Sequence, residues 1–207
     1  MVSAIGGLGQ LSVSDAAPTD RGQERVDAAR NRLLLLDAAR RLIAERGADA
    51  VTMDDIANAA GVGKGTVFRR FGSRAGMMLV LLDEDEQASQ QAFLFGPPPL
   101  GPDAPPTERL VAFGRERIRF AHAHHELLSA ANRDPHHNHN AAAMVLRRHV
   151  LVLLGDAGTT GDHGAQADAL LALLDANYVE HQLADRRLTV EQLGDAWESV
   201  ARKLCGR

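Results

Sequence analysis

The sequence holds a single cysteine, Cys205, in 207 residues, and this scarcity excludes an intramolecular disulfide. One free thiol agrees with a protein kept in a reducing compartment. Long apolar runs are missing too, since MMLVLL at 77–82 is far shorter than the roughly 20 residues of a membrane-spanning helix. The first twenty residues lack the basic start and apolar stretch of a signal peptide. We therefore expect a soluble, cytoplasmic protein without membrane contact.

Strand-like alternation of apolar and polar residues is also absent, whereas apolar residues recur at helical spacing. Proline and glycine gather in loops such as GPPPLGPDAPP at 96–106. These patterns predict an all-α fold of about nine helices, with Thr107 capping the helix that follows the proline-rich loop. The later helices are expected at about 107–125, 126–132, 141–154, 165–185 and 190–204.

Charge is distributed unevenly along the chain, although the net value is only −4. Residues 21–74 carry 11 basic against 7 acidic side chains, whereas residues 75–207 carry 12 against 18. A basic amino-terminal part attached to an acidic body is the pattern expected of a protein that presents one end to a polyanion. The pattern favours nucleic acid as a partner of the basic part.

The stretch TMDDIANAAGVGKGTVFRRFGSR, residues 52–74, predicts two short helices joined by a tight turn. Thr52 and Asp55 have the spacing of a capping box at the start of the first helix. Gly61 is suited to the left-handed conformation that ends a helix, and Val62 to the corner between the helices. The second helix is short and basic, as a recognition helix for a DNA major groove would be.

With its flanking residues this stretch resembles the TetR family of bacterial transcriptional regulators. The resemblance begins with LLDAARRLIAERG at 35–47, continues through VTMDDIANAAGV and ends in GKGTVFRRFGSR, with Gly63 and Phe68 where the family more often has serine and tyrosine. It implies a three-helix helix-turn-helix domain that binds a double-stranded DNA operator. The DNA-binding residues expected are Thr52, Lys64, Gly65, Thr66, Phe68, Arg69, Arg70 and Arg74.

The resemblance also implies an all-helical carboxy-terminal part that binds an effector and pairs two copies through its last two helices. Apolar residues on those helices exceed what one small body easily buries, which favours a homodimer. Packing inside the monomer is the alternative for some of them. The expected interface residues are Leu170, Leu173, Leu174, Trp197, Val200 and Leu204.

Isolated polar residues interrupt the apolar faces of two helices in the carboxy-terminal part. Arg117 and His124 interrupt a face of aromatic and aliphatic residues, and Asn177 and Tyr178 interrupt a leucine-rich run. Binding sites for small molecules are mostly apolar with a few placed polar groups. The alternative for each of these residues is an ordinary side chain that is solvated or hydrogen-bonded within the protein. The acidic run 83–86 is interpreted separately, as a solvated helix face. The expected effector contacts are Phe113, Arg117, Phe120, His124, Asn177 and Tyr178.

Seven of the nine histidines lie between His122 and His149, but their spacing matches no closed metal-ligand set. No nucleophile motif or phosphate-binding glycine loop is present, so we expect neither an enzyme nor a cofactor. The predicted organisation is a disordered extension over 1–28, a DNA-binding domain over 29–75 and an effector-binding and dimerisation domain over 76–207. We expect a repressor released by a small organic effector. A metal-responsive regulator and one controlled by a protein partner remain alternatives.

Overall fold

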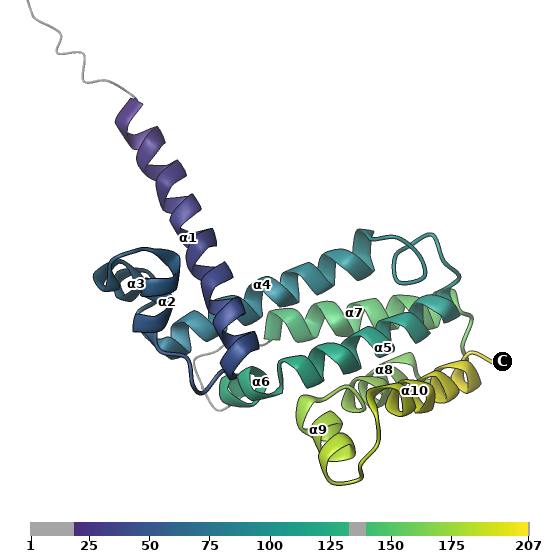
Figure 1. Cartoon of the computed structure of the whole chain (residues 1–207). Coiled ribbons are helices and arrows are strands. Elements are labelled where there is room, and N and C mark those ends of the chain that lie inside the picture. Colours follow the sequence, from purple (N-terminus) through teal and green to yellow (C-terminus); the bar gives the residue numbers. More distant parts are fainter. Residues whose placement is uncertain (1–18, 133–139, 207) are drawn as a thin grey trace, which may run out of the picture. The chain divides into compact units, whose positions relative to one another are not determined.

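The computed structural model describes residues 19–132 and 140–206, with side chains placed for 26–128 and 141–206, and all its regular elements are α-helices (Figure 1). The expected all-α fold is confirmed, and the described residues form ten helices. None of these helices is long and apolar enough to cross a membrane. The helices are α1 (Thr19–Arg46), α2 (Met53–Ala60), α3 (Lys64–Phe71), α4 (Arg74–Phe95), α5 (Pro106–Ala123), α6 (His125–Asn132), α7 (Asn140–Asp156), α8 (His163–Ala172), α9 (Ala176–Ala184) and α10 (Val190–Leu204).

The first helix begins earlier than the sequence suggested. We expected a disordered extension over residues 1–28, but α1 starts at Thr19, so residues 19–28 are helical. The earlier part of the expected extension lies outside the described residues.

The tenth helix arises because the single helix expected over 165–185 is two helices, α8 and α9. Asp175 separates them, since its carboxylate accepts hydrogen bonds from the backbone N–H groups of Asn177 and Tyr178 at 2.9 and 3.1 Å. This is the bonding of an N-cap residue, which starts a new helix rather than continuing the previous one. The expectation for Thr107 was also wrong, because the N-cap of α5 is Pro105 and Thr107 is buried within the first turn.

The chain divides into two compact units within α3, the first ending at Val67 and the second beginning at Phe68. In the first unit α1 packs against α2. Leu35, Leu36 and Ile56 are fully buried there and form its core with Val67. The second unit is built around α5, which contacts α7, α9 and α10 (Figure 1).

His149 of α7 is a core residue of the second unit, with its ring centroid 4.5 Å from that of Phe93 and 5.1 Å from that of Phe113. Its side chain is almost completely buried. Burial, with a smaller contribution from the charge of Arg109, lowers the pKa of His149 to about 4. The imidazole is therefore predominantly neutral in the folded protein at neutral and mildly acidic pH.

The low pKa of His149 predicts a loss of stability at acid pH. Below about pH 6.5 the unfolded chain binds a proton at this ring and the folded chain does not, so protons favour unfolding. By about pH 4 the free energy of unfolding should fall by roughly 3 kcal/mol through this group alone. Urea unfolding at neutral pH and near pH 4.5 should show a smaller acid loss for His149→Phe than for the wild type.

A matched control is His122→Phe, because His122 is exposed. This variant should keep the full acid loss of the wild type. Equal acid losses in His149→Phe and in the wild type would show that the buried ring is not the cause.

Candidate nucleic-acid interface and ligand cavity

The helix-turn-helix starts with a complete capping box on α2. The Thr52 side chain accepts a hydrogen bond from the Asp55 backbone N–H at 3.1 Å, and the Asp55 carboxylate accepts one from the Thr52 backbone N–H at 3.0 Å. The Thr52 hydroxyl also donates to this carboxylate at 2.6 Å. These bonds lower the pKa of Asp55. The box fixes where α2 begins and confirms the capping predicted from the sequence.

The turn between α2 and α3 depends on Gly61, which has φ of +68°. In this left-handed conformation the backbone N–H of Gly61 donates to the Asn58 carbonyl, and that of Val62 donates to the Ala57 carbonyl at 3.0 Å. These bonds satisfy carbonyl groups left over at the helix end. The chain therefore turns over the three residues between α2 and α3 and enters α3 at Lys64.

Helix α3 is short and presents polar and basic side chains to solvent. Phe68, Arg69 and Arg70 are exposed, and Thr66 is half-buried. No atom outside the local chain lies within 4 Å of the Cβ position of Gly65, so the backbone of α3 is open to close approach there. An exposed basic helix after a tight turn is the form that enters a major groove in helix-turn-helix proteins.

Lys64 at the start of α3 is paired with Asp54 of α2, its Nζ lying 2.6 Å from the carboxylate oxygen. Both side chains are more than half exposed, so the pair adds little stability and is screened by salt. A DNA phosphate can therefore replace Asp54 as the partner of Lys64 at small cost.

In the second unit the start of α4 is a further phosphate-binding candidate. Ser73 is the N-cap, and its hydroxyl accepts a hydrogen bond from the Gly76 backbone N–H at 3.0 Å. Arg74 is the first residue of the helix. The helix dipole favours an anion at such a terminus, and the adjacent guanidinium carries a positive charge.

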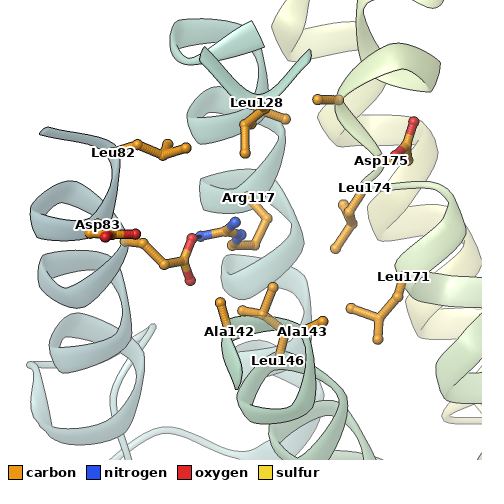
Figure 2. Close-up of a pocket in the computed structure, with 13 residues that line it drawn as sticks. Leu82, Asp83, Arg117, Leu128, Ala142, Ala143, Leu146, Leu171, Leu174 and Asp175 are labelled. Carbon is orange, nitrogen blue, oxygen red and sulfur yellow. Dashed lines mark ion pairs between the residues drawn. The ribbon is translucent and has the colours of Figure 1, made fainter. Parts of the chain in front are cut away.

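A cavity of about 280 Å³ lies within the second unit between α4, α5, α7 and α8 (Figure 2). We call it the central cavity. Figure 2 shows Arg117 of α5 placed between the α4 side chains and the leucines of α8 and its end, Leu171 and Leu174. Most of the wall is aliphatic, and the acidic side chains on it are Asp83, Glu86 and Asp175.

Arg117 is buried and already has an anionic partner, since its guanidinium lies 3.0 Å from the Glu86 carboxylate. It also donates to the Ser89 hydroxyl at 3.2 Å and stacks 4.1 Å above the Phe120 ring. Ser89 in turn donates to Glu116 at 3.0 Å. Burial raises the pKa of the Glu116 carboxyl. Arg117 is therefore the centre of a polar network that joins α4 to α5.

The interpretation of residues 83–86 as a solvated face was wrong for two of them. Glu86 pairs with Arg117, and the Asp85 carboxylate lies 3.0 Å from Nε2 of His124. Helical spacing carried a signal for this, since Leu82, Glu86 and Ser89 lie on one face of α4 at intervals of four and three residues. A buried leucine and serine on either side of Glu86 mark it as inward-facing.

The residues expected to contact an effector do not converge on one site. Arg117 lines the central cavity, whereas Phe113 is fully buried in the core and Phe120 lies beneath Arg117 and His124. Asn177 is exposed in the first turn of α9. Tyr178 lines a separate hollow of about 100 Å³ with Leu173, Trp197 and Val200.

The residues expected at a dimer interface differ in how far they are buried within the chain. Trp197 is only 2% exposed, and its indole N–H donates to the Leu110 carbonyl at 3.1 Å, so it belongs to the core of the second unit. Leu170 is equally buried. Leu173, Leu174 and Leu204 are half-buried against the same core, and Val200 is 43% exposed. The burial of Trp197 therefore favours the alternative, packing inside the monomer, over a place at the expected interface.

The histidines of the described segments have separate neighbours. His122 pairs with Glu180, His124 with Asp85, and His149 is enclosed by aromatic rings. Within residues 26–128 and 141–206, no group of three histidine, cysteine or acidic side chains is placed to hold a metal ion. His136, His137 and His139 lie outside the described residues.

Residues 35–81 match the family described as bacterial regulatory proteins, tetR family. The match covers the end of α1, all of α2 and α3 and the first part of α4. The sequence matches none of the curated proteins with which it was compared.

Solved structures of similar fold extend the likeness over both units. A transcriptional regulator from Saccharomonospora viridis in complex with choline has a TM-score of 0.66 and 21% identity, over 83% of this chain and 95% of the other. A TetR-like transcriptional regulator from Rhodococcus sp. RHA1 has a TM-score of 0.58 and 22% identity, over 86% and 97%. The fatty acid degradation regulator FadR from Bacillus halodurans has a TM-score of 0.58 and 19% identity, over 84% and 96%. At these low identities the likeness shows a shared fold alone.

Proposed function

Because the chain belongs to the TetR family of DNA-binding transcriptional regulators, we propose that it acts as a homodimeric repressor released from its operator by a small organic effector. The observation that carries the effector part of this proposal is the central cavity, which α4 lines through Leu82, Asp83 and Glu86. Helix α4 begins at Arg74, directly after α3 and a short link. A ligand that changes the position of α4 therefore acts on the segment that follows the recognition helix.

The proposed mechanism depends on the spacing of two recognition helices in a dimer. Two copies of α3 enter successive major grooves only when they lie about one helical turn of DNA, roughly 34–36 Å, or a multiple of it apart. An effector releases DNA when it binds more tightly to a form of the protein with a different spacing. Tight binding alone is not sufficient, because equal affinity for both forms shifts no population.

The charge of the cavity favours an effector with a cationic or hydrogen-bond-donating group. Arg117 is neutralised by Glu86 at 3.0 Å, which leaves Asp83 and Asp175 as further carboxylates on the wall. Choline, the ligand in the similar Saccharomonospora viridis structure, is a cation. An aliphatic wall with carboxylates at one side suits an apolar organic cation.

Filling the cavity is expected to abolish release without affecting DNA binding. Ala142 of α7 lines the central cavity, so Ala142→Phe places a ring where the effector would lie. This variant is preferable to Arg117→Ala, which leaves Glu86 buried without its partner at a cost of about 3–5 kcal/mol. Fluorescence anisotropy of labelled operator DNA, titrated with choline, benzyltrimethylammonium and other organic cations, should identify a compound that releases the wild type but not Ala142→Phe.

A matched control is Ala141→Phe, because Ala141 is exposed and does not line the cavity. This variant should respond as the wild type does. Release that persists unchanged in Ala142→Phe would place the effector elsewhere. Release by carboxylates alone would contradict the proposed charge of the ligand.

A further inference from the structure

A second cavity, of about 430 Å³, lies between the end of α4, the start of α5 and the middle of α7. We call it the arginine cavity. Arg109 of α5 and Arg148 of α7 line it together with His149, and Leu94, Val145 and Val152 supply apolar wall. Its volume is within the usual range for small-molecule sites. None of its lining residues lines the central cavity.

Within the described residues, the two guanidinium groups of this cavity lack anionic partners. Among the described residues no carboxylate forms an ion pair with Arg109 or Arg148, whereas Arg115, Arg117, Arg147 and Arg202 are each paired. The lining contains no acidic residue. The charged side chains of the arginine cavity are therefore all basic, whereas Asp83, Glu86 and Asp175 line the wall of the central cavity.

Two buried polar atoms at this cavity also lack hydrogen-bond partners within the described structure. They are Nε of Arg109 and Nε2 of His149, and the His149 side chain is only 6% exposed. Within the described residues, the only hydrogen bond of the Arg109 side chain is a long one of 3.4 Å to the Phe93 carbonyl. Leaving such groups unsatisfied costs about 1–3 kcal/mol each, and a site that tolerates this is expected to gain its partners on binding.

We infer that the arginine cavity is a second ligand site, which binds a small amphiphilic organic anion with its carboxylate at Arg109 and Arg148. The planar guanidinium groups match the geometry of a carboxylate. His149 is neutral and offers Nε2 as a donor in one of its tautomers. Met144, 70% exposed, and Val152, 39% exposed, extend the apolar wall to the surface and suit an alkyl or aryl body. This site does not depend on the proposed role of the central cavity.

The test is calorimetric titration of the full chain with sodium octanoate. Octan-1-ol has the same alkyl body without charge, and octyltrimethylammonium carries the opposite charge. Octanoate should bind at least about tenfold more tightly than octan-1-ol, because each charge-assisted hydrogen bond to a guanidinium contributes on that scale. Octyltrimethylammonium should not compete with octanoate.

Substitutions then assign the binding to the cavity. Arg148→Gln changes an exposed side chain and should weaken octanoate binding about tenfold. Arg109→Gln/Arg148→Gln should weaken octanoate further and leave octan-1-ol unchanged. The matched control Arg119→Gln removes an exposed arginine from α5 outside the cavity and should bind octanoate normally. Ala142→Phe, which fills the central cavity, should also bind octanoate normally.

Several results would overturn the inference. These are undetectable octanoate binding, an affinity unchanged in Arg109→Gln/Arg148→Gln, and loss of binding in Ala142→Phe. Sedimentation provides a further check. If the wild type is a dimer and Met144→Glu is a monomer, a second copy of the chain covers this face instead.

Discussion

Gly114→Ala is expected to destabilise the second unit severely, by about 3 kcal/mol or more, at the upper end of the cost of overpacking a core. Gly114 is buried in α5, and a Cβ built there would overlap Cε2 and Nε1 of the Trp197 indole ring. The ring cannot easily move, since it is 2% exposed and its N–H donates to the Leu110 carbonyl at 3.1 Å. Urea unfolding followed by circular dichroism measures the effect.

A double-mutant cycle tests whether the contact itself is the cause. Trp197→Leu alone should cost several kcal/mol through the space it leaves, as large-to-small core substitutions do. The double variant Gly114→Ala/Trp197→Leu should lose at least about 1 kcal/mol less stability than the sum of the two single variants, because the alanine occupies part of that space. The control Gly155→Ala should be neutral or stabilising, since nothing lies within 4 Å of its Cβ position in α7.

This result would also decide between two interpretations of Trp197. A Gly114→Ala protein as stable as Gly155→Ala would mean that the indole ring does not lie over Gly114, and would restore Trp197 as a candidate interface residue. Severe destabilisation of Gly114→Ala would establish that α10 packs against α5 of the same chain. The ion pairs of Arg115 with Glu198 and of Arg202 with Glu108 fasten the same two helices.

Arg69→Ala is expected to weaken binding to specific DNA by about 1–3 kcal/mol, a loss of tenfold or more, and to relax sequence preference at one base pair. Arg69 is exposed in the last turn of α3, the helix proposed to enter the major groove. Arg74→Ala should instead weaken all sequences alike and reduce the slope of log affinity against log salt by about one unit, as the loss of one phosphate contact does. Anisotropy titrations at several salt concentrations measure both effects.

Arg119→Ala removes the same charge from an exposed position of α5, outside the helix-turn-helix, and is the matched control. It should leave both the affinity and the salt slope unchanged. If Arg69→Ala and Arg74→Ala bind specific DNA as tightly as this control does, the proposed docking of α3 and α4 is wrong.

The helix-turn-helix was predictable from sequence because its determinants are local. The capping box of Thr52 and Asp55, the left-handed Gly61 and the N-cap Ser73 each act within a few residues. Short-range hydrogen bonding therefore fixes these boundaries whatever the rest of the chain does. The boundary between α8 and α9 is also determined locally, by the N-cap Asp175. The leucine-rich run around Asp175 instead favoured one continuous helix.

The second unit was less predictable because its pairings join residues distant in sequence. Arg117 was correctly singled out as a polar residue on an apolar face, but its partner Glu86 lies 31 positions earlier. Trp197 has the helical spacing of an interface residue, and its packing against Gly114, 83 positions earlier, shows why it is buried. Periodicity identifies an apolar face and does not say whether the same chain or a second copy covers it.

The most direct test of the central claim, that a dimer of this chain recognises a specific operator through α3, is selection of bound sequences from a random double-stranded DNA pool by the purified protein. The account predicts enrichment of a pseudo-palindrome whose half-sites lie one helical turn, or a multiple of it, apart, with Arg69→Ala losing preference at symmetry-related positions. Enrichment of a single unpaired half-site, or none above the starting pool, would contradict it.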